Sequence, residues 1–143
     1  MTVDVEVVRE PSDELVSAFA RLLPQLSRSA APLDHSDIAR MLSHEANTVF
    51  LARIDGNIVG TLTLVMVPIP SGLRARIEDV VVDESARGTG VGTALTKAAI
   101  ECAQSANART VDLTSRPDRD SAGRLYERLG FRERDSRVYR LAE

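Results

Sequence analysis

The chain has 143 residues, of which 43% are hydrophobic and 27% are charged, and its formal net charge is −3. This balance is typical of a single globular domain covering residues 1–143, and it excludes a disordered chain. Acidic and basic residues are interspersed without a basic stripe, so the charge pattern gives no reason to expect nucleic acid as a partner.

Cysteine content and the length of apolar runs indicate the expected cellular compartment. Cys102 is the single cysteine, which rules out an intrachain disulfide and a cysteine-based metal cluster and favours a reducing, cytoplasmic setting. Residues 1–6 lack the basic and apolar regions of a signal peptide. No apolar run approaches the roughly 20 residues that span a bilayer, so we expect no membrane partner.

In chain order, the hydrophobic pattern predicts a mixed α/β fold. Pro24 is expected to end the first helix, because proline interrupts a helix interior. Asp55-Gly56-Asn57 lies between two runs of β-branched residues and indicates a hairpin, which excludes a wholly parallel sheet. The predicted strands are 3–8, 48–54, 58–67, 74–82, 110–113 and a last pair around Phe131 and 138–141. The first predicted helix starts within residues 11–14 and ends at Pro24. The other predicted helices are 36–44, 90–106 and 120–129.

The most informative segment, residues 82–93, joins a hydrophobic strand to a helix through a turn with three glycines. Glycine lets a ligand approach the backbone, and the first turn of a helix leaves its N–H groups without partners. These N–H groups and the helix dipole form an anion site, and Arg87 adds donors at its rim. The expected ligand carries a di- or triphosphate-like group.

Two common phosphate-binding motifs are absent from this turn. A P-loop needs Gly-Lys-Ser/Thr at the helix start, but Gly92 is followed by Thr93-Ala94. A dinucleotide fingerprint needs Gly-x-Gly-x-x-Gly, but the sixth position counted from Gly88 is Thr93. A nucleotide-binding switch is therefore disfavoured.

Two motifs in the right order resemble the GNAT superfamily of acetyltransferases. Ile77-Glu78-Asp79-Val80-Val81-Val82, followed by Arg87-Gly88-Thr89-Gly90-Val91-Gly92, is similar to the family's coenzyme A signature. Ala122-Gly123-Arg124-Leu125-Tyr126-Glu127-Arg128-Leu129-Gly130-Phe131 is similar to its Ala-x-x-Leu-Tyr-Glu-x-x-Gly-Phe segment. Where the family often has asparagine, three residues before that alanine, this chain has Arg119, which we expect to meet a phosphate instead.

The resemblance implies a central mixed, mostly antiparallel sheet with helices on both faces and a splay between the fourth and fifth strands. The pantetheine arm of acetyl-CoA would lie in that splay against main-chain groups of Val80 and Val82. The pyrophosphate would lie on the N–H groups of residues 87–93, and no metal is expected. The residues expected to bind coenzyme A are Val80, Val81, Val82, Arg87, Gly88, Thr89, Gly90, Val91, Gly92, Thr93, Arg119 and Tyr126.

The resemblance also implies direct acetyl transfer to a primary amine of a small molecule or a protein. A main-chain N–H near Val80 would polarise the thioester carbonyl. Tyr126 is the expected proton donor to the departing thiolate, with a core tyrosine as the alternative. Glu78 is the first candidate base and Asp79 the second, and both also fit surface or substrate-positioning carboxylates.

The remaining alternatives concern the class of protein and its acceptor. A non-catalytic coenzyme-A-binding sensor has no need of Glu78, Asp79 and Tyr126, so these residues favour the enzyme. Amino-acid, polyamine, aminoglycoside and protein amines remain open as acceptors. Ile77-Glu78-Asp79 also resembles the corresponding strand of glucosamine-6-phosphate acetyltransferases, and a homodimer is one expected assembly. His35 and His44 are predicted to be surface residues, and Cys102 a core residue.

Overall fold

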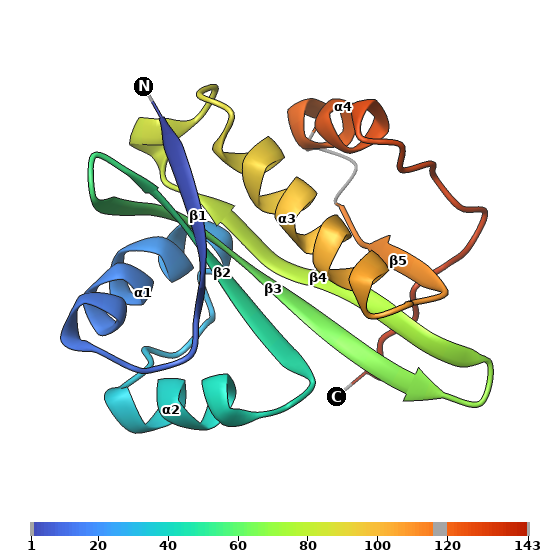
Figure 1. The fold of residues 1–143 in the computed structure, drawn as a ribbon, viewed down its shortest axis with the longest axis horizontal. Helices are drawn as coiled ribbons and strands as arrows, with labels where there is room; N and C mark the ends of the chain where they lie inside the picture. The colour runs from blue at the N-terminus through green and yellow to red at the C-terminus, as the bar shows by residue number, and fades with distance from the viewer. Residues whose placement is uncertain (1, 116–119, 143) are drawn as a thin grey trace.

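A five-stranded sheet with helices on both faces forms the centre of the molecule, as Figure 1 shows. The computed structural model describes residues 2–115 and 120–142. The strands are β1 (Val3–Val8), β2 (Asn47–Ile54), β3 (Asn57–Ile69), β4 (Gly72–Val82) and β5 (Thr110–Leu113). The helices are α1 (Asp13–Leu26), α2 (His35–Ser43), α3 (Val91–Ser105) and α4 (Asp120–Arg128), with a short 3₁₀ turn, η1 (Glu84–Ala86).

The strands lie in chain order across the sheet, β1-β2-β3-β4-β5. Neighbours from β1 to β4 are antiparallel, whereas β4 and β5 are parallel. The parallel pair needs a long crossover, and α3 supplies it. The predicted mixed, mostly antiparallel sheet with helices on both faces is therefore confirmed.

Two hydrophobic clusters hold the layers together, one on each face of the sheet. α1 and α2 bury their apolar sides on one face, and α3 buries its apolar side on the other. Gly60 in β3 allows α3 to pack closely on the sheet. A Cβ at this position would lie 2.9 Å from Cγ1 of Val91, the first residue of α3. The cluster under α3 includes Leu62, Leu64, Ala75, Ile77, Val91, Leu95 and Ala99, and the cluster under α1 and α2 includes Leu15, Phe19, Leu22, Ile38, Val49 and Leu51.

α1 begins where the sequence indicates, and α2 begins at His35, one residue before its predicted start. The Ser12 hydroxyl accepts the Leu15 N–H, and Asp34 and Asp37 form a reciprocal capping box at the start of α2. Such caps satisfy N–H groups that a helix leaves free at its first turn. No helix in residues 2–115 and 120–142 is long and apolar enough to cross a bilayer.

The expectation that Pro24 ends the first helix is wrong, since α1 continues to Leu26. A proline removes only one helical N–H, and here it lies in the last turn, where the disruption is small. The Ser27 N–H closes the helix on the Leu23 carbonyl at 2.9 Å. The two residues gained, Gln25 and Leu26, both contribute to the site described below.

The predicted last strand pair is also wrong, because residues 131–142 form no strand in the structure. Apart from Ser136, residues 132–137 are all charged, so they separate the two short apolar segments that the prediction relied on. In the described residues neither segment forms a ladder with another strand, and a strand without a ladder partner is not stable. Val138, Tyr139 and Leu141 remain exposed as a result.

Candidate active site

The glycine-rich turn between β4 and α3 presents a row of backbone N–H groups. Gly88 and Gly90 adopt φ of 78° and 90°, in the left-handed region that favours glycine. The first helical hydrogen bond runs from the Ala94 N–H to the Gly90 carbonyl, 3.0 Å. The N–H groups of residues 91–93 precede that bond and lie in the first turn, at the positive end of α3.

Two residues of the predicted turn are already engaged in the fold. The Arg87 N–H donates to the Glu84 carbonyl at 3.4 Å, so the open N–H groups begin at Gly88. The Thr89 hydroxyl donates to the Ala86 carbonyl. The Arg87 side chain is exposed.

β4 and β5 separate beside this turn. Their pairing runs from Arg74 with Thr110 to Ile77 with Leu113. β4 continues to Val82. Within the described residues, this last part of β4 has no strand on the β5 side, so its main-chain groups there are open to a bound molecule. The pairing of the fourth and fifth strands thus stops where the splay is expected.

A β-bulge places the two candidate carboxylates in the splay. Thr63 pairs with Glu78 and Thr61 with Val81, so one residue of β3 is opposite two residues of β4. Asp79, one of those two, has a φ of 50°. A bulge re-aims side chains and shifts their alternation, which is why Ile77 and Val80 both pack towards α3.

The separated strands enclose a cavity of about 190 Å³. Four segments meet around it: the end of α1, the bulge of β4, the residues after β5, and α4. All three candidate catalytic residues lie in its wall. The lining consists of Leu26, Ile77, Glu78, Asp79, Val80, Leu113, Thr114, Ser115, Ala122 and Tyr126.

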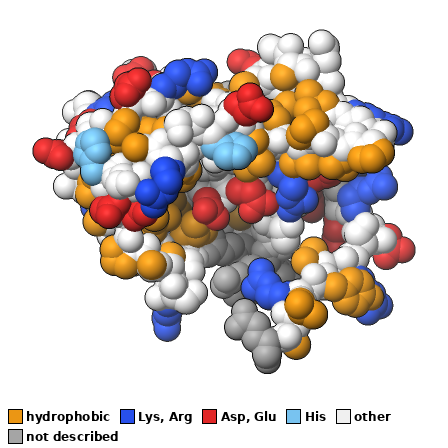
Figure 2. Space-filling view, turned by 90° about the horizontal axis from the view of Figure 1, so that it is seen from below, with side chains coloured by type: hydrophobic (Ala, Val, Ile, Leu, Met, Phe, Trp, Pro, Cys, Tyr) orange, Lys and Arg blue, Asp and Glu red, His pale blue; other side chains and the backbone are white. Residues whose placement is uncertain are grey.

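The two carboxylates differ in their surroundings. The Arg76 Nε donates to Glu78 Oε1 at 3.1 Å, and another nitrogen of the same guanidinium donates to the Thr114 hydroxyl at 3.3 Å. Partial burial raises the pKa of Asp79, and the negative charge of Glu78 raises it further. Figure 2 shows acidic and basic side chains side by side at a hollow in this face of the molecule. Glu78 thus accepts a hydrogen bond from the Arg76 guanidinium, whereas the surroundings of Asp79 disfavour its ionised form.

Tyr126 reaches the cavity from α4. Its ring packs edge-on against Phe131, with centroids 5.9 Å apart and planes at 71°. The Phe131 N–H donates to the Tyr126 carbonyl at 3.0 Å, which closes the C-terminal end of α4. The aromatic pair therefore holds the tyrosine ring in one orientation in the wall of the cavity.

Comparison with known proteins identifies the family. The sequence matches the family described as "Acetyltransferase (GNAT) family" over residues 13–131. The chain belongs to the GNAT acetyltransferase family. It is 35% identical to a glucosamine 6-phosphate N-acetyltransferase of Trypanosoma brucei brucei over 145 residues, covering 95% of each chain.

Solved structures agree with this assignment. A crystal structure of a Trypanosoma brucei acetyltransferase superposes with a TM-score of 0.80 and 31% identity, covering 99% of this chain and all of the other. Glucosamine-6-phosphate N-acetyltransferase from Arabidopsis thaliana shares the fold with a TM-score of 0.80 at 18% identity, with both chains fully covered. The protein is a GNAT N-acetyltransferase, and GNAT acetyltransferases use acetyl-CoA as cosubstrate.

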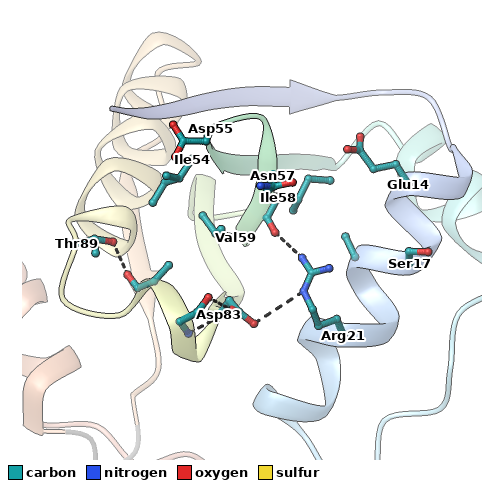
Figure 3. A pocket seen from close by; sticks show the side chains of 13 residues that line it. Glu14, Ser17, Arg21, Ile54, Asp55, Asn57, Ile58, Val59, Asp83 and Thr89 are labelled. Atoms are coloured by element: carbon teal, nitrogen blue, oxygen red, sulfur yellow. Dashed lines mark hydrogen bonds and ion pairs between the residues drawn. The ribbon is translucent and has the colours of Figure 1, made fainter. Parts of the chain in front are cut away.

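A larger cavity lies elsewhere in this GNAT domain, between α1, the β2–β3 hairpin and the back of the glycine-rich turn (Figure 3). Its volume is about 540 Å³, and its wall includes Arg21, Asp55 and Asp83. None of the candidate catalytic residues lines it. We therefore place the acetyl transfer at the smaller cavity, where the open strand, the carboxylates and Tyr126 meet.

The other predicted residues fall outside the cavity wall. His35 is the first residue of α2 and His44 its C-cap. Cys102 is half-buried and packs against the cluster under α3. Arg119 lies outside the described residues.

Sequence reasoning missed two residues of this GNAT site. Leu26 lines the cavity because α1 continues past Pro24. Arg76, the partner of Glu78, is two residues before it on the same strand, and this i, i+2 spacing is a signal that was available in the sequence.

Proposed function

We propose that this N-acetyltransferase acetylates the amino group of an amino sugar phosphate, with glucosamine 6-phosphate as the acceptor to test first. The observation that carries this choice is the 35% identity, over 95% of both chains, to a glucosamine 6-phosphate N-acetyltransferase. The carboxylates of Glu78 and Asp79 at the cavity suit an acceptor that arrives as an ammonium ion. Protein amines and other small amines are the competing acceptors.

The residues present fit coenzyme A at the turn and the splay. The N–H groups of residues 88–93, at the positive end of α3, would hold its pyrophosphate, with Arg87 at the rim. The unpaired main-chain groups of residues 80–82 in β4 would pair with the pantetheine arm. Bound acetyl-CoA supplies an activated thioester carbon, which an N–H of β4 near Val80 would polarise.

We place the general base at Asp79 and not at Glu78, the first candidate from sequence. A general base is more effective when its pKa is nearer the working pH, and for a carboxylate this means a raised pKa. Asp79 has the raised pKa. Glu78 accepts a hydrogen bond from Arg76, which holds its side chain in place and suits it to orient the acceptor.

Tyr126 is the group we assign as proton donor to the departing sulfur. It lines the same cavity as Asp79, from α4 on the opposite wall. Its ring is held by Phe131, so the hydroxyl keeps one position as the thiolate leaves. An acid on one side and a base on the other allow transfer without a covalent intermediate on the enzyme.

Thiol release from acetyl-CoA tests the proposal. The acceptor panel comprises glucosamine 6-phosphate, glucosamine, spermidine, lysine, an aminoglycoside and a lysine peptide. We expect kcat/KM for glucosamine 6-phosphate to exceed that for glucosamine at least roughly tenfold, because a site built for a phosphate rejects the analogue that lacks it. A preference for the polyamine or the peptide would overturn the choice of acceptor, and the absence of thiol release with every amine would overturn the transfer itself.

A further inference from the structure

One side chain of α1, Gln25, is bonded to the start of the glycine-rich turn. Its Nε2 donates to Asp83 Oδ1 at 2.8 Å, and its Oε1 accepts the Glu84 N–H at 3.0 Å. The same Nε2 also donates to the Arg21 carbonyl at 3.2 Å. Donor and acceptor sides of the amide are therefore both occupied, which fixes its orientation, although Gln25 and the turn lie 58 and 59 residues apart in sequence.

Asp83 is the first residue after β4 and begins the turn. Its N–H donates to the Val59 carbonyl at 2.8 Å, which ties it to the sheet. Its carboxylate caps η1 by accepting the Ser85 N–H and hydroxyl. Hydrogen bonds from the Ser85 hydroxyl and from Gln25 lower the pKa of Asp83, so it stays an ionised acceptor at neutral pH.

Arg21, one helical turn before Gln25, reaches the same carboxylate. Its Nε lies 3.9 Å from Asp83 Oδ1, and its guanidinium also donates to the Ile58 carbonyl (Figure 3). This ion pair is long and half-exposed, so it contributes little by itself. The shorter, bidentate contact comes from Gln25.

Gln25 also connects the turn with the acceptor side of the site. The next residue, Leu26, lines the cavity that holds Glu78 and Asp79. Both positions exist as helix because α1 continues through Pro24. The C-terminal end of α1 thus contacts two parts of the site. Gln25 contacts the proposed coenzyme turn, and Leu26 lines the proposed acceptor cavity.

From this arrangement we infer that Gln25 is a positioning residue for coenzyme A, acting through Asp83 and the Glu84 backbone. By holding the first residues of the turn against α1, it sets the direction in which the N–H groups of residues 88–93 point. The inference rests on the proposed coenzyme site at that turn, and it adds a residue on a different element that has no contact with the coenzyme.

Gln25→Glu is the variant that tests it. The change keeps the size and the acceptor for the Glu84 N–H, but it replaces the donor with a charge that repels Asp83. At pH 7.5 we expect Kd and KM for acetyl-CoA to rise about tenfold, since a hydrogen bond to an ionised group is lost. kcat at saturating acetyl-CoA should change less than about twofold, because the reacting groups are untouched.

Gln104→Glu is the matched control. It makes the same chemical change at an exposed position near the opposite end of α3. Its acetyl-CoA affinity should equal that of the parent. Thermal unfolding of both variants separates a general loss of stability from a change at the turn.

Rescue by a second substitution distinguishes positioning from a merely structural role. In Gln25→Glu/Asp83→Asn the hydrogen bond is reversed: the new amide at 83 donates to the carboxylate at 25 while its oxygen still accepts from Ser85. We expect Asp83→Asn alone to weaken acetyl-CoA binding and the double variant to return to within about threefold of the parent. Parental affinity in Gln25→Glu, or a loss that Asp83→Asn does not rescue, would overturn the inference. No binding of acetyl-CoA by the parent in calorimetry would instead overturn the coenzyme site itself, and this inference with it.

Discussion

Asp79 combines an unusual backbone conformation with an unfavourable charge. It lies at the bulge with a φ of 50°, and partial burial and the neighbouring Glu78 raise its pKa. The folded protein therefore holds a proton on Asp79 more tightly than the unfolded chain does. Its contribution to stability is fully present below the ordinary pKa of 3.8 and is lost as pH rises through the raised folded pKa.

Asp79→Asn should consequently make the protein more stable at neutral pH. Asparagine tolerates the left-handed region and cannot ionise, so the substitution removes the charge without straining the backbone. We expect the melting temperature of the variant to exceed that of the parent by an amount that grows from pH 4 to pH 7 and then levels off. Thermal unfolding across this range measures it, and a variant less stable than the parent at pH 7 would show that the charge is well compensated.

The same substitution should remove most of the activity. If Asp79 is the base, Asp79→Asn lowers kcat by about 10²-fold or more and removes the acidic limb of the pH–rate profile, which the raised pKa of Asp79 shifts to higher pH in the parent. Glu78→Gln should act mainly on the KM of the acceptor, because Arg76 already neutralises Glu78. The reverse pattern would restore Glu78 as the base.

Tyr126→Phe separates the hydroxyl from the ring. The edge-on contact with Phe131 is kept, so we expect the acetyl-CoA Kd to stay near that of the parent. kcat should fall about 10²-fold, the usual loss for a general acid. Tyr139→Phe, at a tyrosine that is 86% exposed, is the matched control. A Tyr126→Phe enzyme with turnover within a factor of two of the control would mean that another group protonates the sulfur.

At the scale of the element, the turn before α3 depends on glycine at position 90. Gly90 has a φ of 90° and no atom within 4 Å of an added Cβ, so a side chain there points into open space where we place the pyrophosphate. Gly90→Leu should cost about 1–2 kcal/mol of unfolding free energy from the left-handed backbone and weaken acetyl-CoA binding more than roughly tenfold.

Gly56 provides the control for that experiment. It has a φ of 80° in the β2–β3 hairpin and equally open surroundings. Gly56→Leu should therefore lose similar stability and keep its acetyl-CoA affinity. Denaturant titration measures the stability of both variants, and calorimetry measures their affinity for acetyl-CoA. An equal loss of affinity in both would show that the turn is not part of the coenzyme site.

At the scale of the whole molecule, the C-terminal segment leaves apolar side chains in solvent. Val138, Tyr139 and Leu141 are 80%, 86% and 92% exposed. β5 is the last strand of the sheet in the described residues, so its outer edge is open. In a two-fold dimer, the C-terminal segment of each copy can lie against the β5 edge of the other copy.

We therefore expect a homodimer in which residues 138–141 of each copy pair with the β5 edge of the other. Light scattering should give twice the mass of the 143-residue chain at micromolar concentration. Tyr139→Ser/Leu141→Ser should shift the protein to a monomer, because it removes apolar area from the segment and leaves α4 intact. A parent that is monomeric at these concentrations would contradict the prediction.

Local patterns in the sequence were sufficient for most of the fold and for the phosphate-binding turn. Glycine at positions of positive φ, a strand before the turn and a helix after it are properties of neighbouring residues, so residues 82–93 could be interpreted without the rest of the chain. The Asp55–Gly56 hairpin and the caps of α1 and α2 follow for the same reason. Of the two wrong predictions, the one at residues 138–141 concerns a segment whose state depends on a strand partner elsewhere in the chain, whereas the one at Pro24 concerns how far a helix continues past a proline.

Tertiary structure alone decided which side chains meet. The contact of Gln25 with Asp83, and the meeting of Leu26, Asp79 and Tyr126 at one cavity, depend on the register of the sheet and on how far each helix extends. The difference between Glu78 and Asp79 has the same origin, since the partial burial that raises the pKa of Asp79 and the contact of Arg76 with Glu78 both depend on the folded structure. Sequence determines local conformation through sterics and hydrogen bonds between near neighbours, whereas the electrostatics of a site arise from groups that only folding brings together.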